Sequence, residues 1–272
     1  MRYEITPPKG LVNINLSEIW RYRDLLYILV WRDIKVRYKQ TVVGVVWAIF
    51  QPLLTMIIFS VLFGRLAKLP SEGVPYPVFV YTGLLLWNYF SSSLANSSES
   101  LISNDAIIKK VYFPRILLPG STVVTPAVDF VISFIIFLAL MFYYHFTPSA
   151  VGLLLIPVLL LITMISSLGL GLFLSSLNIK YRDVRHILPF FIQILMYITP
   201  VIYPVSIIPA NFQWIAYLNP MSGVITLARS LLLHTSSVDW KLLPISFGVS
   251  LVFLLIGLAY FRKTERFFAD IM

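Results

Sequence analysis

The stretch LLYILVWRDIKVRYKQTVVGVVWAIFQPLL, from Leu25 to Leu54, changes character in its middle. Charged residues crowd the segment between Arg32 and Lys39, and the next charged residue after it is Arg65. An uncharged apolar run of this length can cross the hydrocarbon core of a bilayer, which takes about 20 helical residues. The stretch therefore predicts a helix at the membrane surface that leads directly into a membrane-spanning helix.

The first half of the stretch has the pattern of an amphipathic helix. If residues 24–40 are helical, the spacing places one set of apolar and aromatic side chains on a single face: Tyr27, Val30, Trp31, Ile34 and Tyr38. Arg32, Lys35 and Lys39 fall on the other face. Asp33 and Arg37 are spaced as an i,i+4 ion pair. Such an interface helix lies at headgroup depth, although a plain anchor that satisfies the positive-inside rule explains the same pattern.

The composition of the whole chain is that of a membrane protein. Of its 272 residues, 58% are hydrophobic and 12% are charged, and the mean hydropathy is +0.85. The absence of cysteine excludes disulfides and thiolate metal sites. The N-terminus lacks the apolar core of a signal peptide, so we expect no cleaved leader. We predict an all-α polytopic membrane protein with a single transmembrane domain over residues 1–272.

Six apolar windows are candidate spans. They cover residues 42–63, 78–94, 120–144, 151–177, 187–203 and 242–261, and the only charged residue in any of them is Asp129. The fifth window is short and contains Pro189 and Pro200, which predict broken or tilted ends. Residues 42–261 then form a six-span core between a segment over 1–41 and a tail over 262–272.

The distribution of positive charge predicts the orientation. Seventeen of the 21 lysines and arginines fall on one side of the six-span arrangement. Because such residues collect in cytoplasmic loops, we expect both termini in the cytoplasm. The net charge of +9 is then a topological signal, since nucleic-acid binding would need a solvated basic domain.

Four segments of the sequence together carry a family resemblance. They are WRDIKVRYKQTVVGVVWAIFQPLL at 31–54, KKVYFPRILLP at 109–119 and NIKYRDVRHILPFFIQILMYITPVIY at 178–203, followed by YLNPM at 217–221. In this order they resemble the membrane (permease) subunit of bacterial ABC-type polysaccharide exporters, which move lipid-linked O-antigen, teichoic acid and capsule glycans. The resemblance covers nearly the whole chain.

The resemblance implies six spans per subunit and a homodimer in the bacterial inner membrane with the export path between the two copies. It also implies a separate cytoplasmic ATPase dimer that binds ATP and Mg²⁺. In agreement, the chain has no G-x-x-x-x-G-K-[ST] phosphate loop, so we expect neither an enzyme nor a cofactor in this chain. The expected cargo is a polyprenyl-pyrophosphate-linked or related lipid-linked glycan.

The loop SNDAIIKKVYFPRILLPG, residues 103–120, is the candidate contact with the ATPase. Ser103, Asn104 or Asp105 is placed to cap a helix of eight residues that ends before Pro114. By resemblance this is the coupling helix, and a helix resting on lipid headgroups is the alternative. The candidate coupling residues are Ile107, Ile108, Lys109, Lys110, Tyr112, Phe113 and Arg115.

The export path must pass sugar rings, and flat aromatic faces can stack on them. The candidates are Trp47, Phe50, Phe59, Tyr81, Trp87, Tyr89, Phe90, Phe190 and Tyr197, although interfacial belts and lipid contacts account for many aromatics in membrane proteins. The serine-rich end of the second window, NYFSSSLANSSESLISN at 88–104, would be costly against acyl chains. It either faces a water-filled path or subunit contact, or the helix leaves the membrane near Leu94.

Charged residues near the cytoplasmic side suggest two further roles. Asp129 is the acid inside a span, and we favour a structural pairing with a basic or hydroxyl group of a neighbouring helix over a proton or ion pathway. A lipid phosphate entering at headgroup depth would meet four cations there, unless these only fix topology or touch anionic lipid. These four are Arg37, Lys39, Arg182 and Arg185.

Residues 204–239 are too broken for a seventh span. They predict two short helices split at Asn219 and Pro220, with Arg229 and His234 toward the external side. By resemblance they are re-entrant gate helices in which Trp214 and Tyr217 help to close the exit, and an external amphipathic hairpin is the alternative.

Other functional classes fit less well. An ion-coupled secondary transporter should show several intramembrane acids or an internal repeat, and the chain has one such acid and no repeat. A membrane enzyme should show clustered acids or histidines, and the best cluster, YRDVRH at 181–186, is thin. An ABC exporter of a drug or small lipid is the nearest alternative.

Overall fold

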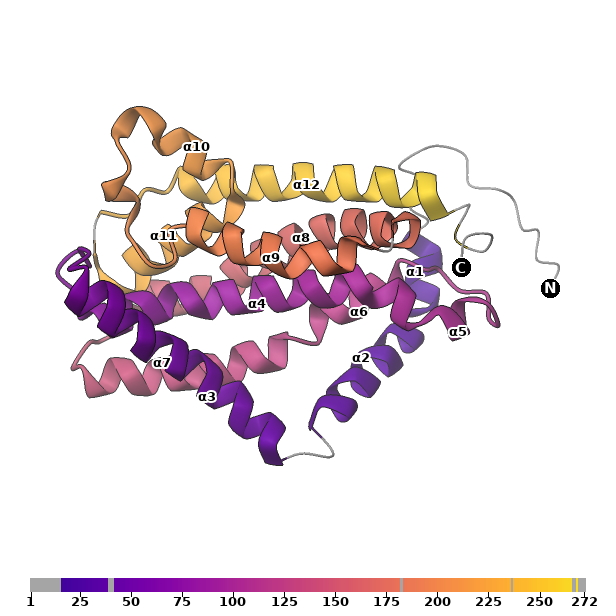
Figure 1. Cartoon of the computed structure of the whole chain (residues 1–272), viewed down its shortest axis with the longest axis horizontal. Coiled ribbons are helices and arrows are strands. Elements are labelled where there is room, and N and C mark those ends of the chain that lie inside the picture. The colour runs from indigo at the N-terminus through magenta and orange to yellow at the C-terminus, as the bar shows by residue number, and fades with distance from the viewer. Residues whose placement is uncertain (1–15, 39–41, 182, 236, 266–267, 269–272) are drawn as a thin grey trace.

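The chain forms an elongated helical bundle in a computed structural model that describes residues 16–38, 42–181, 183–235, 237–265 and 268 (Figure 1). No strand occurs in these ranges. The helices that precede the long central ones are α1 (Leu16–Arg21), α2 (Arg23–Tyr38) and α3 (Val42–Phe59). The remaining α-helices are α4 (Tyr76–Ser103), α5 (Asp105–Ile108), α6 (Leu117–Val124), α7 (Ala127–Tyr143), α8 (Ala150–Lys180), α9 (Val184–Ile198), α10 (Gln213–Tyr217), α11 (Pro220–Leu233) and α12 (Leu242–Glu265).

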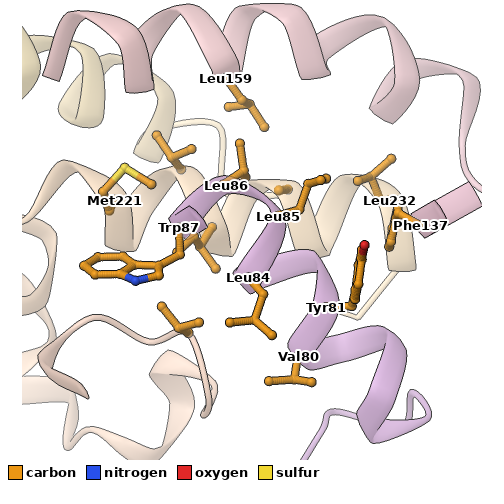
Figure 2. Packing of buried hydrophobic residues seen from close by; sticks show 14 of the residues in the cluster. Val80, Tyr81, Leu84, Leu85, Leu86, Trp87, Phe137, Leu159, Met221 and Leu232 are labelled. Carbon is orange, nitrogen blue, oxygen red and sulfur yellow. The ribbon is translucent and has the colours of Figure 1, made fainter. Parts of the chain in front are cut away.

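Helix α4 is the centre of the bundle. Most of its side chains are buried, and it contacts α3, α6, α7, α8, α9 and α11. Figure 2 shows α4 residues from Val80 to Trp87 packed among Phe137 of α7, Leu159 of α8, and Met221 and Leu232 of α11. Helix α4 is thus surrounded by protein on most sides.

Glycines let α8 lie between α4 and α12. A Cβ atom at Gly169 would come within 2.4 Å of the backbone of Leu254 in α12, and one at Gly257 within 2.0 Å of the Gly169 carbonyl oxygen. A Cβ atom at Gly171 would meet Ser97 of α4 at 2.3 Å. Membrane helices that pack this closely use small residues at the crossing point, because there is little hydrophobic drive between them in lipid.

Each of the six apolar windows contains helix, but the helix boundaries differ from those of the windows, and the fifth window is helical only as far as Ile198. Helix α3 continues as a π-helix through Ser60–Leu66, and the third window is broken at Thr125 and Pro126 into α6 and α7. Helix α4 continues without a break to Ser103, nine residues beyond Leu94. The helices thus extend past the second window and divide the third, while the ends of the membrane spans stay predictions.

Four helical segments are long and apolar enough to cross a membrane. They are Ile49–Leu66, Leu117–Tyr143, Ala150–Lys180 and Leu242–Glu265. Serine and asparagine lower the hydropathy of α4, and α9 has only 15 residues. The chain is therefore a multi-pass membrane protein, and the count of six spans stays a prediction.

The α8–α12 crossing gives a test of the packing. We expect Gly257→Ala to lower the stability of the purified chain by about 1–3 kcal/mol, because the added methyl group overlaps the backbone of α8. Gly248→Ala is the matched control on the same helix, since a Cβ atom there meets nothing within 4 Å. Thermal unfolding in detergent measures both, and equal melting temperatures would contradict the proposed contact.

Candidate functional site

A polar pocket of about 580 Å³ lies between α2, α4 and α6. Helix α2 forms one wall because it packs along α6, with Leu26 next to Gly120 and Leu29 buried in the core. The other walls come from the polar end of α4, from Thr122 of α6 and from Thr125 directly after α6. The lining residues are Arg32, Asp33, Val36, Arg37, Asn96, Glu99, Ser100, Ser103, Asn104, Thr122 and Thr125.

The charges of α2 are paired differently from the prediction. Arg32 forms an ion pair with Asp33 at 2.8 Å and donates a second hydrogen bond to Asn104 Oδ1 at 3.0 Å. Arg37 pairs with Asp129 of α7 at 2.8 Å instead of with Asp33. The expected i,i+4 pair is wrong, because Arg37 pairs with Asp129 of α7 while Asp33 pairs with its neighbour Arg32 in the same helix.

Asp129 is the point where α2 is fixed to α7. Besides the ion pair with Arg37, its carboxylate accepts a hydrogen bond from the Tyr38 hydroxyl group. Both side chains of the ion pair are partly exposed, so solvent weakens the electrostatic attraction between them. The structure confirms the predicted pairing of Asp129 with a basic and a hydroxyl group. Arg37 is consequently shared between this contact and the pocket.

The described part of the structure does not bring the predicted phosphate-binding cations together in one cluster. Arg37 borders the pocket, whereas Arg185 is exposed on α9 and its Nε donates to His186 Nε2 at 3.2 Å. Lys39 and Arg182 lie outside the described residues. Their role stays a prediction.

The serine-rich end of α4 divides between two surroundings. Ser93, Ser97, Ser98 and Ser100 are buried inside the chain, where Asn178 of α8 donates to the Ser98 carbonyl oxygen at 3.2 Å. On another side of the helix, Asn96, Glu99 and Ser103 line the pocket. The expectation of one polar face toward a path or subunit contact is corrected, since half of these residues pack within the subunit. The alternative that the helix leaves the membrane near Leu94 stays a prediction, because α4 continuing to Ser103 does not locate the edge of the bilayer.

The loop after α4 is less helical than predicted. Helix α5 has four residues in place of eight, and neither Asn104 nor another residue caps it with a side-chain hydrogen bond. Asp105 instead pairs with Lys109 at 2.9 Å. An apolar surface still projects from this loop, because Ile107, Val111 and Tyr112 are exposed.

Other residues of this loop hold the subunit together. Ile108 and Phe113 are buried in the core beside Leu29. Arg115 donates to the Glu265 carbonyl oxygen at 2.8 Å and lies over the ring of Phe268. The predicted set of coupling residues therefore contains buried and exposed members, and only the exposed ones are available to another molecule. Lys110 is among these exposed residues.

Tyr112 stands beside the acids of α1 and α12. Partial desolvation, and after it the carboxylates of Glu18 and Glu265, raise the pKa of the Tyr112 phenol. The raised pKa keeps the Tyr112 hydroxyl group protonated, and able to donate a hydrogen bond, to a higher pH than an ordinary phenol.

The nine predicted path aromatics differ in their exposure: four are buried, one is partly buried and four are exposed. Tyr81, Trp87, Tyr89 and Phe90 are buried in the chain, where the Tyr89 hydroxyl donates to the Val123 carbonyl oxygen at 2.8 Å. The Tyr81 ring stacks on Phe137 with ring centres 6.3 Å apart. These four are enclosed by protein within the subunit, and their place along a path stays a prediction. Phe59 packs against the core, whereas Trp47, Phe50, Phe190 and Tyr197 are exposed on α3 and α9.

The segment between α9 and α12 contains the two predicted helices. Helix α10 ends at Tyr217 and α11 begins at Pro220, with the Asn219 side chain accepting a hydrogen bond from the Met221 backbone at 3.0 Å. Trp214 is exposed and Tyr217 is partly buried. Arg229 is buried against α4 with 3% of its surface exposed, and its position on the external side of the membrane stays a prediction.

Comparison with known proteins decides the family. The sequence matches the model of the ABC-2 type transporter over residues 24–233. The chain belongs to the ABC-2 type transporter family.

Named relatives of this ABC-2 chain match it along most of its length. It is 33% identical over 249 residues to the O-antigen export system permease protein RfbA of Klebsiella pneumoniae, which covers 92% of this chain and 95% of the relative. It is 32% identical to the protein of the same name in Myxococcus xanthus, over 94% of this chain and 98% of the relative. The polysialic acid transport protein KpsM of Escherichia coli is 26% identical over 86% of this chain and 91% of the relative.

Sequence reasoning missed several residues of the pocket in this ABC-2 chain. Thr122 and Thr125 lie in an apolar window, and only their hydroxyl groups distinguish them there. Asn96 belongs to the serine-rich segment, but the direction of its side chain depends on how α4 packs on α8. The pocket depends on three helices that are far apart in sequence, so no local motif could predict it.

The contact between α2 and α7 gives a test of the site. We expect Asp129→Asn to raise the labelling rate of a cysteine that replaces the buried Leu29 about fivefold, as a loss of about 1 kcal/mol in local stability implies. The charge-exchanged pair Arg37→Asp with Asp129→Arg should restore slow labelling. Arg185→Gln is the control, because that arginine is exposed on another helix. Failure of the exchanged pair to restore protection would show that the ion pair does not hold α2.

Proposed function

We propose that this chain is the permease subunit of an ATP-driven exporter that moves lipid-linked polysaccharide across the bacterial inner membrane. The observation that carries the proposal is the likeness to O-antigen export permeases over more than nine-tenths of the chain. A shared organisation over that length favours a shared kind of cargo. The further likeness to a polysialic acid transport protein favours glycans as a class.

The exposed aromatics favour a path between two copies of the chain. Trp47 and Phe50 of α3 have ring centres 6.4 Å apart and are open to the outside of the subunit, as are Phe190 and Tyr197 of α9. Flat faces of this kind can stack on sugar rings with little demand on the hydroxyl pattern. A homodimer with six spans per copy and cytoplasmic termini would place these faces along the transport path, with α10 and α11 as re-entrant gate helices at its exit.

The polar pocket is suited to the headgroup of the lipid-linked cargo. Arg32 and Arg37 are its cations, and a phosphate oxygen accepts well from a guanidinium group. Asn96, Glu99 and Ser103 supply groups that bind sugar hydroxyls. Because Arg37 also pairs with Asp129, a phosphate would compete with that carboxylate, so capture and release of the headgroup would be coupled to the position of α2.

A separate ATPase would supply the energy. The chain contains no phosphate loop, so ATP and Mg²⁺ belong to the partner. The exposed Ile107, Val111 and Tyr112 provide an apolar contact for it. Movement of the ATPase would then reach α4 through the short loop.

Reconstitution of the chain with its ATPase tests the function. We expect lipid-linked polysaccharide to stimulate ATP hydrolysis and to be transported into proteoliposomes. Single-chain phospholipids and hydrophobic drugs should do neither. Stimulation and transport with a drug or small lipid alone would favour the alternative exporter and contradict the proposal.

The coupling surface gives a second test. Tyr112→Ala should lower the amount of glycan exported for each ATP hydrolysed without changing the melting temperature, because the side chain is exposed. Phe113→Ala is the matched control at the next position: it removes a buried ring and should lower the stability by about 3 kcal/mol. Wild-type coupling in the Tyr112 variant would show that the ATPase docks elsewhere.

A further inference from the structure

The connection between α9 and α10 contains a buried stretch without helical hydrogen bonds. Helix α9 ends at Ile198, and the next short helical turn begins at Val205. We call residues 199–204 the α9–α10 linker. Val201 and Ile202 in this linker are almost completely buried. Since buried carbonyl groups need hydrogen-bond donors, and no backbone ladder supplies them here, side chains must do so.

Two side chains from other helices donate to four consecutive carbonyl groups of the linker. Arg229 of α11 donates through Nη1 to Pro200 at 2.7 Å and to Tyr203 at 3.3 Å, and through Nη2 to Val201. The Tyr76 hydroxyl group of α4 donates to the Ile202 carbonyl oxygen at 2.7 Å. The linker is thus held by α4 and α11 along its central residues.

Arg229 is unusual because it is a buried cation held by uncharged groups. It is 3% exposed, and it forms no ion pair with a carboxylate in the described part of the chain. Its Nε donates to the Phe79 carbonyl oxygen at 3.2 Å, and the guanidinium carbon lies 3.7 Å from the centre of the Phe79 ring. Carbonyl dipoles and the face of an aromatic ring offset part of the cost of burying the charge.

The geometry requires arginine in place of a general positive charge. A guanidinium group offers five donors in a rigid plane, whereas a lysine ammonium group is a compact charge with three donors. The four carbonyl oxygens that Arg229 reaches belong to two separate segments, α4 and the linker. A lysine at this position could reach only some of them.

Helix α4 leaves room for this contact at one glycine. A Cβ atom at Gly83 would lie 2.7 Å from Arg229 Nη2 and 2.8 Å from the Val201 carbonyl oxygen. Both ends of the linker are also fixed: Asn219 donates to the Thr199 hydroxyl at 2.7 Å, and the Tyr203 hydroxyl donates to the Ile198 carbonyl oxygen at 2.9 Å. The close approach at Gly83 therefore belongs to an arrangement that extends over the whole linker.

We propose that Arg229 is a positioning residue that fixes the end of α9 to α4 and α11, so that these three helices move as one body there. Gating motions then occur in α10, whose Trp214 is exposed, and at the opposite end of α9. This use of the contact in gating rests on the proposed transport function. The fixed linker itself does not rest on the transport function, because the hydrogen bonds that hold it are present in the chain alone.

The absence of native cysteine allows a direct measurement of the linker. A single cysteine replaces Val201 in the linker or, as a control, Leu159 of α8, and both positions are fully buried. Labelling by a thiol reagent is followed in the purified chain without nucleotide. We expect Arg229→Lys to speed labelling at position 201 about tenfold, because hydrogen bonds to a buried charge are lost, and to leave position 159 slow.

The outcomes separate the positioning role from simpler ones. Slow labelling at position 201 in Arg229→Lys would mean that charge alone suffices, and equally faster labelling at both positions would mean a general loss of stability; either result overturns the inference. Gly83→Ala disturbs the same contact from α4 with the guanidinium intact, and it should also speed labelling only at position 201. Unchanged labelling in that variant likewise overturns the inference, and it decides the matter if Arg229→Lys does not fold.

A transport assay keeps this inference distinct from the proposed function. Arg229→Lys should lower export of lipid-linked glycan about tenfold while the chain still assembles with its ATPase. If the labelling change is confined to position 201 but the wild-type chain exports no glycan, the fixed linker stands and the transport proposal is refuted. Normal export together with faster labelling at position 201 would refute the link to gating.

Discussion

A polar group that lies away from water must find its partner inside the protein, and most of this structure follows from that constraint. Within a helix the backbone satisfies itself, which is why the apolar windows are helical. Polar chemistry remains where helices break or carry hydroxyl groups. At those places side chains from distant helices supply the partners, as Arg229 does for the linker and as Tyr38 and Arg37 do for Asp129.

Helix α4 connects the two ends of the molecule at which these polar contacts collect. Its polar end lines the pocket beside α2, and its other end receives the linker at Gly83. Between them, the helix is packed among α7, α8 and α11 (Figure 2). A buried helix of 28 residues with glycine contacts to its neighbours can transmit a displacement along its axis better than it can bend.

The sequence predicted the helices well because periodic apolar runs depend on local information. Their contacts were harder, because a run that is apolar on all sides has no pattern to show which face meets protein. Tyr81 and Trp87 were therefore assigned to a path, although they pack in the core, whereas Trp47 and Phe190 are exposed. The prediction of charge pairing was wrong for a related reason. The i,i+4 spacing indicated a pair between Arg37 and Asp33, whereas in the folded chain Arg37 pairs with Asp129.

The distribution of exposed apolar surface separates a part of the chain that is packed within itself from a part whose apolar side chains are open. Helices α4 and α11 bury nearly all their large side chains within one chain, whereas α3 and α9 leave aromatic rings open. A glycan path of the proposed kind would need open rings and a rigid support behind them. Helix α9 has exposed rings, and the linker ties its end to α4 and α11.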